Sequence, residues 1–128
     1  MARATVDASE VYRYAAHIGS VMDRVEPEAA KVVERAALNV KRAAQQAMRG
    51  HVRGRYLKHY GRSITYDMLE PTVAEIGPDS AMPQGGMGRG VEFGSAHTPP
   101  MPHLIRSGED EMPNLEKWID QVVARGLR

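Results

Sequence analysis

A stripe of small apolar residues in residues 25–48 restricts the folds open to this chain. The apolar positions recur every three or four residues and most charged and amide side chains fall between them; they are Ala29, Val33, Ala36, Val40, Ala43, Ala44 and Ala47. This spacing predicts an amphipathic helix. Because most of the stripe is alanine, a neighbouring element can approach it closely. The pattern therefore indicates a long helix that lies on a sheet or on another subunit.

A first helix is predicted ahead of this stripe. Asp7 and Glu10 have the spacing of a capping box, and apolar residues follow at helical intervals. We therefore expect an N-terminal helix within residues 1–24. Pro27 interrupts the pattern, and because proline is favourable in the first turn of a helix, we expect the second helix, residues 25–48, to open there.

The middle of the chain, residues 49–104, combines a predicted β-hairpin with loops. Two segments, 63–66 and 72–76, are rich in β-branched and aromatic residues, and a turn at 67–71 would join them as antiparallel strands. Residues 78–90 are rich in glycine, proline and methionine and predict a long loop that reaches a neighbouring subunit.

A C-terminal helix is predicted within residues 105–128. Its regular apolar pattern starts at Pro113, and Gly126 is placed to end it. The predicted fold class is α+β, with long N-terminal helices packed on a small antiparallel sheet and a C-terminal helix. A chain of 128 residues has room for one core, so we expect a single domain, 1–128.

The composition excludes several classes of protein. There are no cysteines, which rules out disulfides and cysteine-ligated zinc. The formal net charge is +1, so no strong overall attraction to nucleic acid or to an anionic membrane is expected. No apolar run approaches the length of a membrane span, and we expect no membrane partner.

No catalytic, cofactor-binding or metal-binding residues are predicted. The five histidines lack the spacing of a metal motif. The serines have no nucleophile-elbow sequence around them. The glycine-rich run at 85–90 lacks the Lys-Ser/Thr of a phosphate-binding loop. Three consecutive acids at 109–111 precede a helix pattern, where negative charge favours the helix dipole. These absences predict a protein that is not an enzyme.

A basic stretch at residues 49–62 leaves two interpretations open. It contains no acid, and its five cations are Arg49, Arg53, Arg55, Lys58 and Arg62. Tyr56 and Tyr60 lie among them, so the stretch could contact phosphates and stack on bases. Acids outnumber bases in the rest of the chain, so the same cations could instead meet an acidic surface of another subunit.

The segment from Val91 to Leu104 has an order of residues that no regular helix or strand requires. Gly94 can adopt backbone angles that are closed to other residues, and three prolines hold the following chain extended. Such a connector has a fixed shape and loses little entropy when it docks. We expect a subunit interface formed by Val91, Glu92, Phe93, Gly94, Pro99, Pro100, Pro102, His103 and Leu104.

The order of several motifs along the chain resembles that of a known family. The segments concerned are Asn39-Val40-Lys41, Arg62-Ser63-Ile64-Thr65-Tyr66, Ala74-Glu75-Ile76-Gly77-Pro78-Asp79, Pro83-Gln84-Gly85-Gly86, Val91-Glu92-Phe93-Gly94 and Pro99-Pro100-Met101-Pro102-His103-Leu104. Together they resemble the tail-completion or head-tail joining proteins of long-tailed bacteriophages, in the version common among phages of actinobacteria. The best single marker is Val/Leu-Glu-Phe/Tyr-Gly followed shortly by Pro-x-Pro-His/Phe-Leu, and the resemblance covers residues 25–125.

The chain departs from the family pattern at two places. Many members carry Ala-Pro-Val-Asp-Thr-Gly-x-Leu between the long helix and the first strand, where this chain has its basic stretch. Members also often have Pro-Phe-Leu-x-Pro-Ala after the marker. Here those positions read Pro102-His103-Leu104-Ile105-Arg106-Ser107, so we expect the following helix to begin later.

The resemblance implies a non-enzymatic virion component, assembled in the host cytoplasm and located in the neck or at the top of the tail tube. It implies a homo-oligomeric ring of six subunits that contacts the major tail tube protein and the head-tail connector or stopper protein. Contact with genomic DNA in the lumen, through the basic stretch, is the alternative role.

Overall fold

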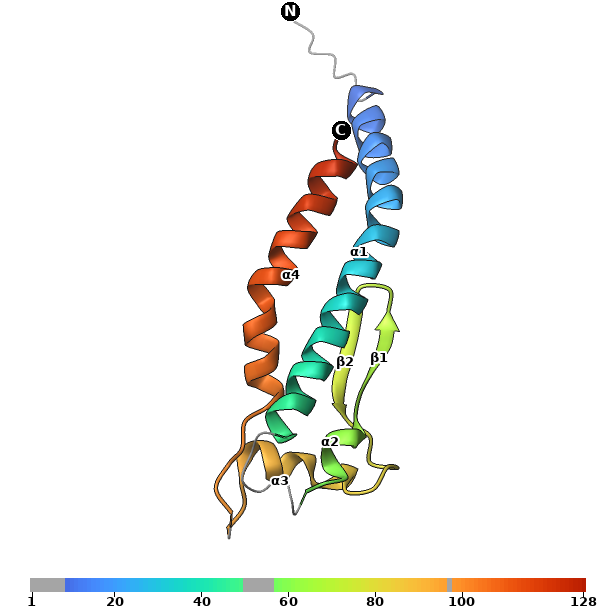
Figure 1. The fold of residues 1–128 in the computed structure, drawn as a ribbon. Helices are drawn as coiled ribbons and strands as arrows, with labels where there is room; N and C mark the ends of the chain where they lie inside the picture. Colours follow the sequence, from blue (N-terminus) through green and yellow to red (C-terminus); the bar gives the residue numbers. More distant parts are fainter. Residues whose placement is uncertain (1–8, 50–56, 97) are drawn as a thin grey trace, which may run out of the picture.

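Two helices and a β-hairpin account for most of the fold in the computed structural model, which describes residues 9–49, 57–96 and 98–128 (Figure 1). Helix α1 spans Ser9–Arg49, and helix α4, Leu104–Gly126, runs antiparallel beside it. The hairpin of β1, Ile64–Glu70, and β2, Val73–Pro78, packs on the C-terminal half of α1. The predicted α+β class, with its long helix, small antiparallel sheet and C-terminal helix, is confirmed.

The predicted division into helices 1–24 and 25–48 is wrong, because α1 continues through Pro27. An interior proline removes one backbone hydrogen bond and crowds the preceding turn. Here the apolar stripe runs unbroken across it, and Val21, Val25 and Ala29 are buried with Val122 of α4. Burial of that stripe on both sides of the proline outweighs the missing bond.

The C-terminal helix starts nearer to the marker segment than predicted. Helix α4 begins at Leu104 and includes Pro113, which lies exposed inside it. Two observations predicted that α4 begins later: Pro113 itself, and the difference between residues 102–107 and the family pattern. Both predictions are therefore wrong. The cause is a carboxylate outside the helix, described below, which satisfies the first backbone N–H groups of α4.

The antiparallel hairpin is confirmed, and its strands are longer than predicted. The turn occupies only Pro71 and Thr72, instead of 67–71. A register shift between Met68 and Glu70 leaves Leu69 without a partner on β2, as in a β-bulge. One face of the hairpin packs on α1 and the other is exposed to solvent.

Residues 78–90 are more ordered than the predicted loop. They contain the 3-10 turn η2, Gly85–Met87, and the start of helix α3, Gly88–Phe93. A side chain at position 85 would overlap the backbone carbonyl of Asp79, so only glycine allows this close turn. Part of the marker segment is thus helical, and the connector of fixed shape begins only at Gly94.

The core is divided into two clusters along the length of α1. One lies where α1 meets α4 and contains Val21, Val25, Ala29 and Val122. The other joins the end of α1 to the hairpin and to the segment from Val91 to Leu104. It contains Ala44, Met48, Tyr60, Ile64, Val91 and Met101. The second cluster carries the candidate site. No helix of the described residues is long and apolar enough to cross a membrane.

Candidate functional site

The predicted interface segment is divided between an inward and an outward side. Val91, Glu92 and His103 are buried within the subunit, at 6%, 5% and 2% exposure. Gly94 and Leu104 are half-buried. The residues that remain available to a partner are Phe93, which is 65% exposed, and Pro99, Pro100 and Pro102, which are also exposed.

Glu92 holds the first turn of α4. Its Oε2 accepts hydrogen bonds from the backbone N–H groups of His103 and Leu104, at 2.9 and 3.0 Å, and its Oε1 accepts one from Ile105 at 3.0 Å. These N–H groups have no partner within the helix. A negative charge at this end also favours the helix dipole. The last turn of α3 and the first turn of α4 are therefore locked together.

His103 links this carboxylate to Tyr60. Its Nδ1 lies 2.8 Å from Glu92 Oε2 and 2.8 Å from the Met101 carbonyl oxygen. Both neighbours are acceptors, so Nδ1 carries a hydrogen. With a neutral ring, Nε2 then accepts the hydrogen bond from the Tyr60 hydroxyl at 2.7 Å. The two rings also pack edge to face, with centroids 5.3 Å apart.

The environment shifts the pKa values of two members of this cluster. Burial raises the pKa of Tyr60 to about 12, and the nearby Glu92 charge adds to the shift. For Glu92, burial acts to raise the pKa, but the backbone N–H donors of residues 103–105 and the His103 ring outweigh it. The pKa of Glu92 is therefore lowered. At neutral pH the structure favours a protonated phenol and an ionised carboxylate.

The Tyr60 shift predicts a loss of stability in alkali. Its pKa is higher in the folded state than in the unfolded state, so its contribution is complete below about pH 10 and is lost as pH rises towards 12. We expect wild type to lose up to about 1.4 kcal/mol per pH unit across that window relative to Tyr60→Phe. Urea denaturation of both proteins at several pH values measures the difference. Parallel curves for the two proteins would contradict the prediction.

The cluster of Tyr60, Glu92 and His103 holds neighbouring segments of the chain in place, because its side chains are buried away from solutes. Tyr60 is 0% exposed, and Glu92 and His103 are nearly as buried. No buried side-chain N or O atom in the described residues lacks a hydrogen-bond partner. The possible stacking of Tyr60 on a nucleic-acid base is therefore wrong, since its ring belongs to the core. Sequence reasoning missed its pairing with His103.

Gly94 has the positive φ that its place in the motif indicated. Its φ is 82° and its ψ is 173°, a region that glycine alone readily occupies. The chain then turns through Ser95 and Thr98, whose backbones bond at 2.9 Å and whose hydroxyls lie 2.6 Å apart. Met101 N donates to Val91 O at 2.7 Å and brings the chain back to α3. The exposed prolines thus lie on a loop that is anchored to α3.

The described cations of the basic stretch share one hollow. Arg49, Lys58 and Arg62 are exposed and, with Gln45, Met48, Leu57 and Gly61, line a cavity of about 400 Å³. None of these lining residues is acidic. Arg53 and Arg55, also predicted for this surface, lie outside the described residues. Within the described part of the chain, no group of three potential ligands is placed to hold a metal ion.

Comparison of the chain with models of protein families, with curated proteins and with solved structures found no match.

Proposed function

We propose that this chain is a structural, non-enzymatic subunit of a ring at the head-tail junction, or at the top of the tail tube, of a long-tailed bacteriophage. The order of motifs over residues 25–125 supports the class of protein. The accessible surface supports assembly. The place of action would be the neck or tail of the virion, after assembly in the host cytoplasm.

The observation that carries the proposal is the set of large apolar side chains that the described residues leave exposed. They include Phe93 at 65%, Leu69 at 60% and Met22 at 57% exposure. Subunits of a permanent assembly keep such surface for their neighbours.

The uncovered features lie on different parts of the subunit, as a closed ring requires. Neighbours in a ring meet through two unlike surfaces. Here α3, which carries the exposed Phe93, lies at one end of the molecule, while the hairpin, which carries the exposed Leu69, lies along α1 (Figure 1). The proposed partners are identical subunits, six in the ring, with the tail tube protein on one side and the connector or stopper protein on the other.

The test is assembly. We expect native mass spectrometry of the purified protein to give a closed oligomer, and negative-stain images to show rings that cap tubes of the tail tube protein. A monomer at all concentrations that also fails to bind tubes or neck particles would contradict the proposal. Tubes incubated without this protein are the control.

The basic hollow favours a second candidate function, contact with DNA. Arg49, Lys58 and Arg62 present three positive charges with no acid among the lining residues. Binding through phosphates weakens steeply with salt. An affinity for duplex DNA that falls steeply between low and physiological salt, and that is lost in Arg49→Ala/Lys58→Ala/Arg62→Ala, would support this role. Binding that is independent of salt, or too weak to detect, would contradict DNA contact. Contact of these cations with an acidic protein surface would then be the favoured interpretation.

A further inference from the structure

Among the described residues, no strand lies beside the outer edge of β2. The sheet that they form consists of β1 and β2. Asp79 N donates to Ser63 O at 2.7 Å, and the bonding pattern of an antiparallel pair alternates. Glu75 and Gly77 therefore bond to β1, and the backbone N–H and C=O groups of Ala74 and Ile76 point away from it. This edge can accept another strand.

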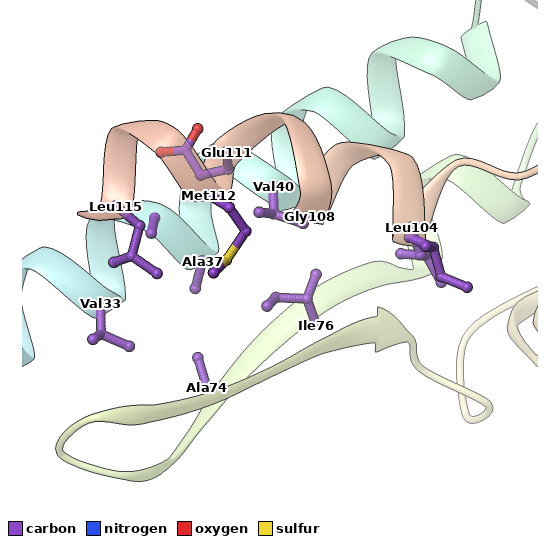
Figure 2. Close-up of a pocket in the computed structure, with 12 residues that line it drawn as sticks. Val33, Ala37, Val40, Ala74, Ile76, Leu104, Gly108, Glu111, Met112 and Leu115 are labelled. Atoms are coloured by element: carbon purple, nitrogen blue, oxygen red, sulfur yellow. The ribbon is translucent and has the colours of Figure 1, made fainter. Parts of the chain in front are cut away.

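An apolar groove of about 390 Å³ lies along this edge, between α1 and α4 (Figure 2). Ala74 and Ile76 line one side, Val33 and Val40 of α1 line the floor, and Met112 belongs to the facing side on α4. A strand added to β2 would place every second side chain in this groove. An open edge beside such a groove has the geometry of strand addition, and the apolar lining favours apolar side chains at every second position of the added strand.

The face of the hairpin that points away from α1 carries two negative charges close together. Asp67 and Glu75 lie directly across from each other on the two strands, and both are exposed. Like charges in this arrangement repel. Neither forms an ion pair with a described residue. A cation on the outward face of an added strand, next to Glu75, would relieve the repulsion.

Residues 2–6 of this chain have the alternation that the site requires. They read Ala2-Arg3-Ala4-Thr5-Val6, so an extended conformation puts three small apolar side chains on one face and Arg3 on the other. We propose that residues 2–6 of a second copy add to the outer edge of β2, with Ala2, Ala4 and Val6 in the groove and Arg3 beside Glu75. The proposal rests on the self-assembly that the proposed function requires.

Chain geometry requires the donor to be another copy. Helix α1 starts at Ser9, and from there to Val33, the nearest part of the groove on α1, the helix is about 36 Å long. Residues 2–8 reach at most about 25 Å when fully extended. The segment therefore falls short of the groove in its own subunit. A neighbour placed alongside brings the two together.

Cysteine cross-linking tests the contact directly, because the chain has no cysteine of its own. One sample carries Thr5→Cys and the other Val73→Cys, which the added strand would bring onto the same outward face. After mixing and oxidation we expect on the order of tenfold more linked dimer than from Thr5→Cys mixed with the exposed control Ala124→Cys. A yield no higher than the control would overturn the proposal.

Charge reversal tests the pairing of Arg3 with Glu75. Arg3→Glu and Glu75→Arg should each weaken self-association roughly fivefold, and the double variant should recover it. Glu75→Arg also removes the repulsion with Asp67, so lost folding cannot explain weaker association. A double variant as weak as the poorer single variant would contradict the pairing, as would single variants that associate like wild type.

The outcomes separate this proposal from the proposed function. Rings in native mass spectra with cross-linking at the control level would mean that another segment or partner occupies the groove, while the structural role stands. Efficient cross-linking by a protein that never joins tail tubes or neck particles would support the strand addition and contradict the virion role.

Discussion

Glu92→Ala is expected to lower the free energy of unfolding by about 3 to 5 kcal/mol. The change leaves three backbone N–H groups of residues 103–105 without their acceptor. It also leaves the buried His103 Nδ1 with one acceptor in place of two. Urea denaturation followed by circular dichroism measures the loss.

A matched control separates the cap from simple loss of negative charge. Glu109 lies in α4, the helix that Glu92 caps, but is exposed, and Glu109→Ala should change stability by no more than about 0.5 kcal/mol. Equal effects of the two substitutions would mean that Glu92 acts only through the helix dipole. The hydrogen-bonded lock between α3 and α4 would then be energetically unimportant.

The same carboxylate makes stability depend on acid. The pKa of Glu92 is lower in the folded state than in the unfolded state, so its contribution is complete above about pH 4.5 and is lost as pH falls through the folded value. We expect wild type to lose stability in this window faster than Glu92→Gln, which has no carboxylate to protonate there. Denaturation curves at several acidic pH values compare the two, and indistinguishable slopes would be evidence against the lowered pKa.

Periodicity predicted the elements of this fold better than their ends. The alanine stripe gave the long helix and its buried face, because burial of one face repeats at a fixed interval. The preference of proline for the first turn predicts helix starts at Pro27 and Pro113, yet both lie inside helices. A local rule for proline cannot include the packing of Val25 on Val122 or the cap that Glu92 supplies, since both join distant parts of the chain.

The candidate site was predictable as a segment but not as an arrangement. Gly94 and the prolines indicated a connector of fixed shape, and the positive φ of Gly94 agrees with that. No sequence pattern could show that Glu92 and His103 face inward while Phe93 faces outward. Their orientation depends on Tyr60, which lies 43 positions from His103 in the chain and supplies the buried hydroxyl.

Gly94→Val is expected to impair assembly more than folding. Valine at the Gly94 backbone angles costs about 1 to 3 kcal/mol of strain, because that region of φ and ψ is populated almost only by glycine. Its Cβ would also lie 2.9 Å from Pro100 N and 3.1 Å from Thr98 O. Relief of these contacts must shift the exposed turn and its prolines relative to Phe93, while the two core clusters need not change.

Urea denaturation and native mass spectrometry of the same preparations separate the two effects. We expect a moderate loss of stability together with a large loss of ring formation and of binding to tail tubes. Gly90→Val is the matched control, because Gly90 lies in α3, the short helix that ends just before Gly94, and has no atom within 4 Å of the added Cβ. If Gly94→Val assembles as well as Gly90→Val, the shape of this loop does not matter to the ring. The assignment of Phe93 and the prolines to the subunit interface would then be contradicted.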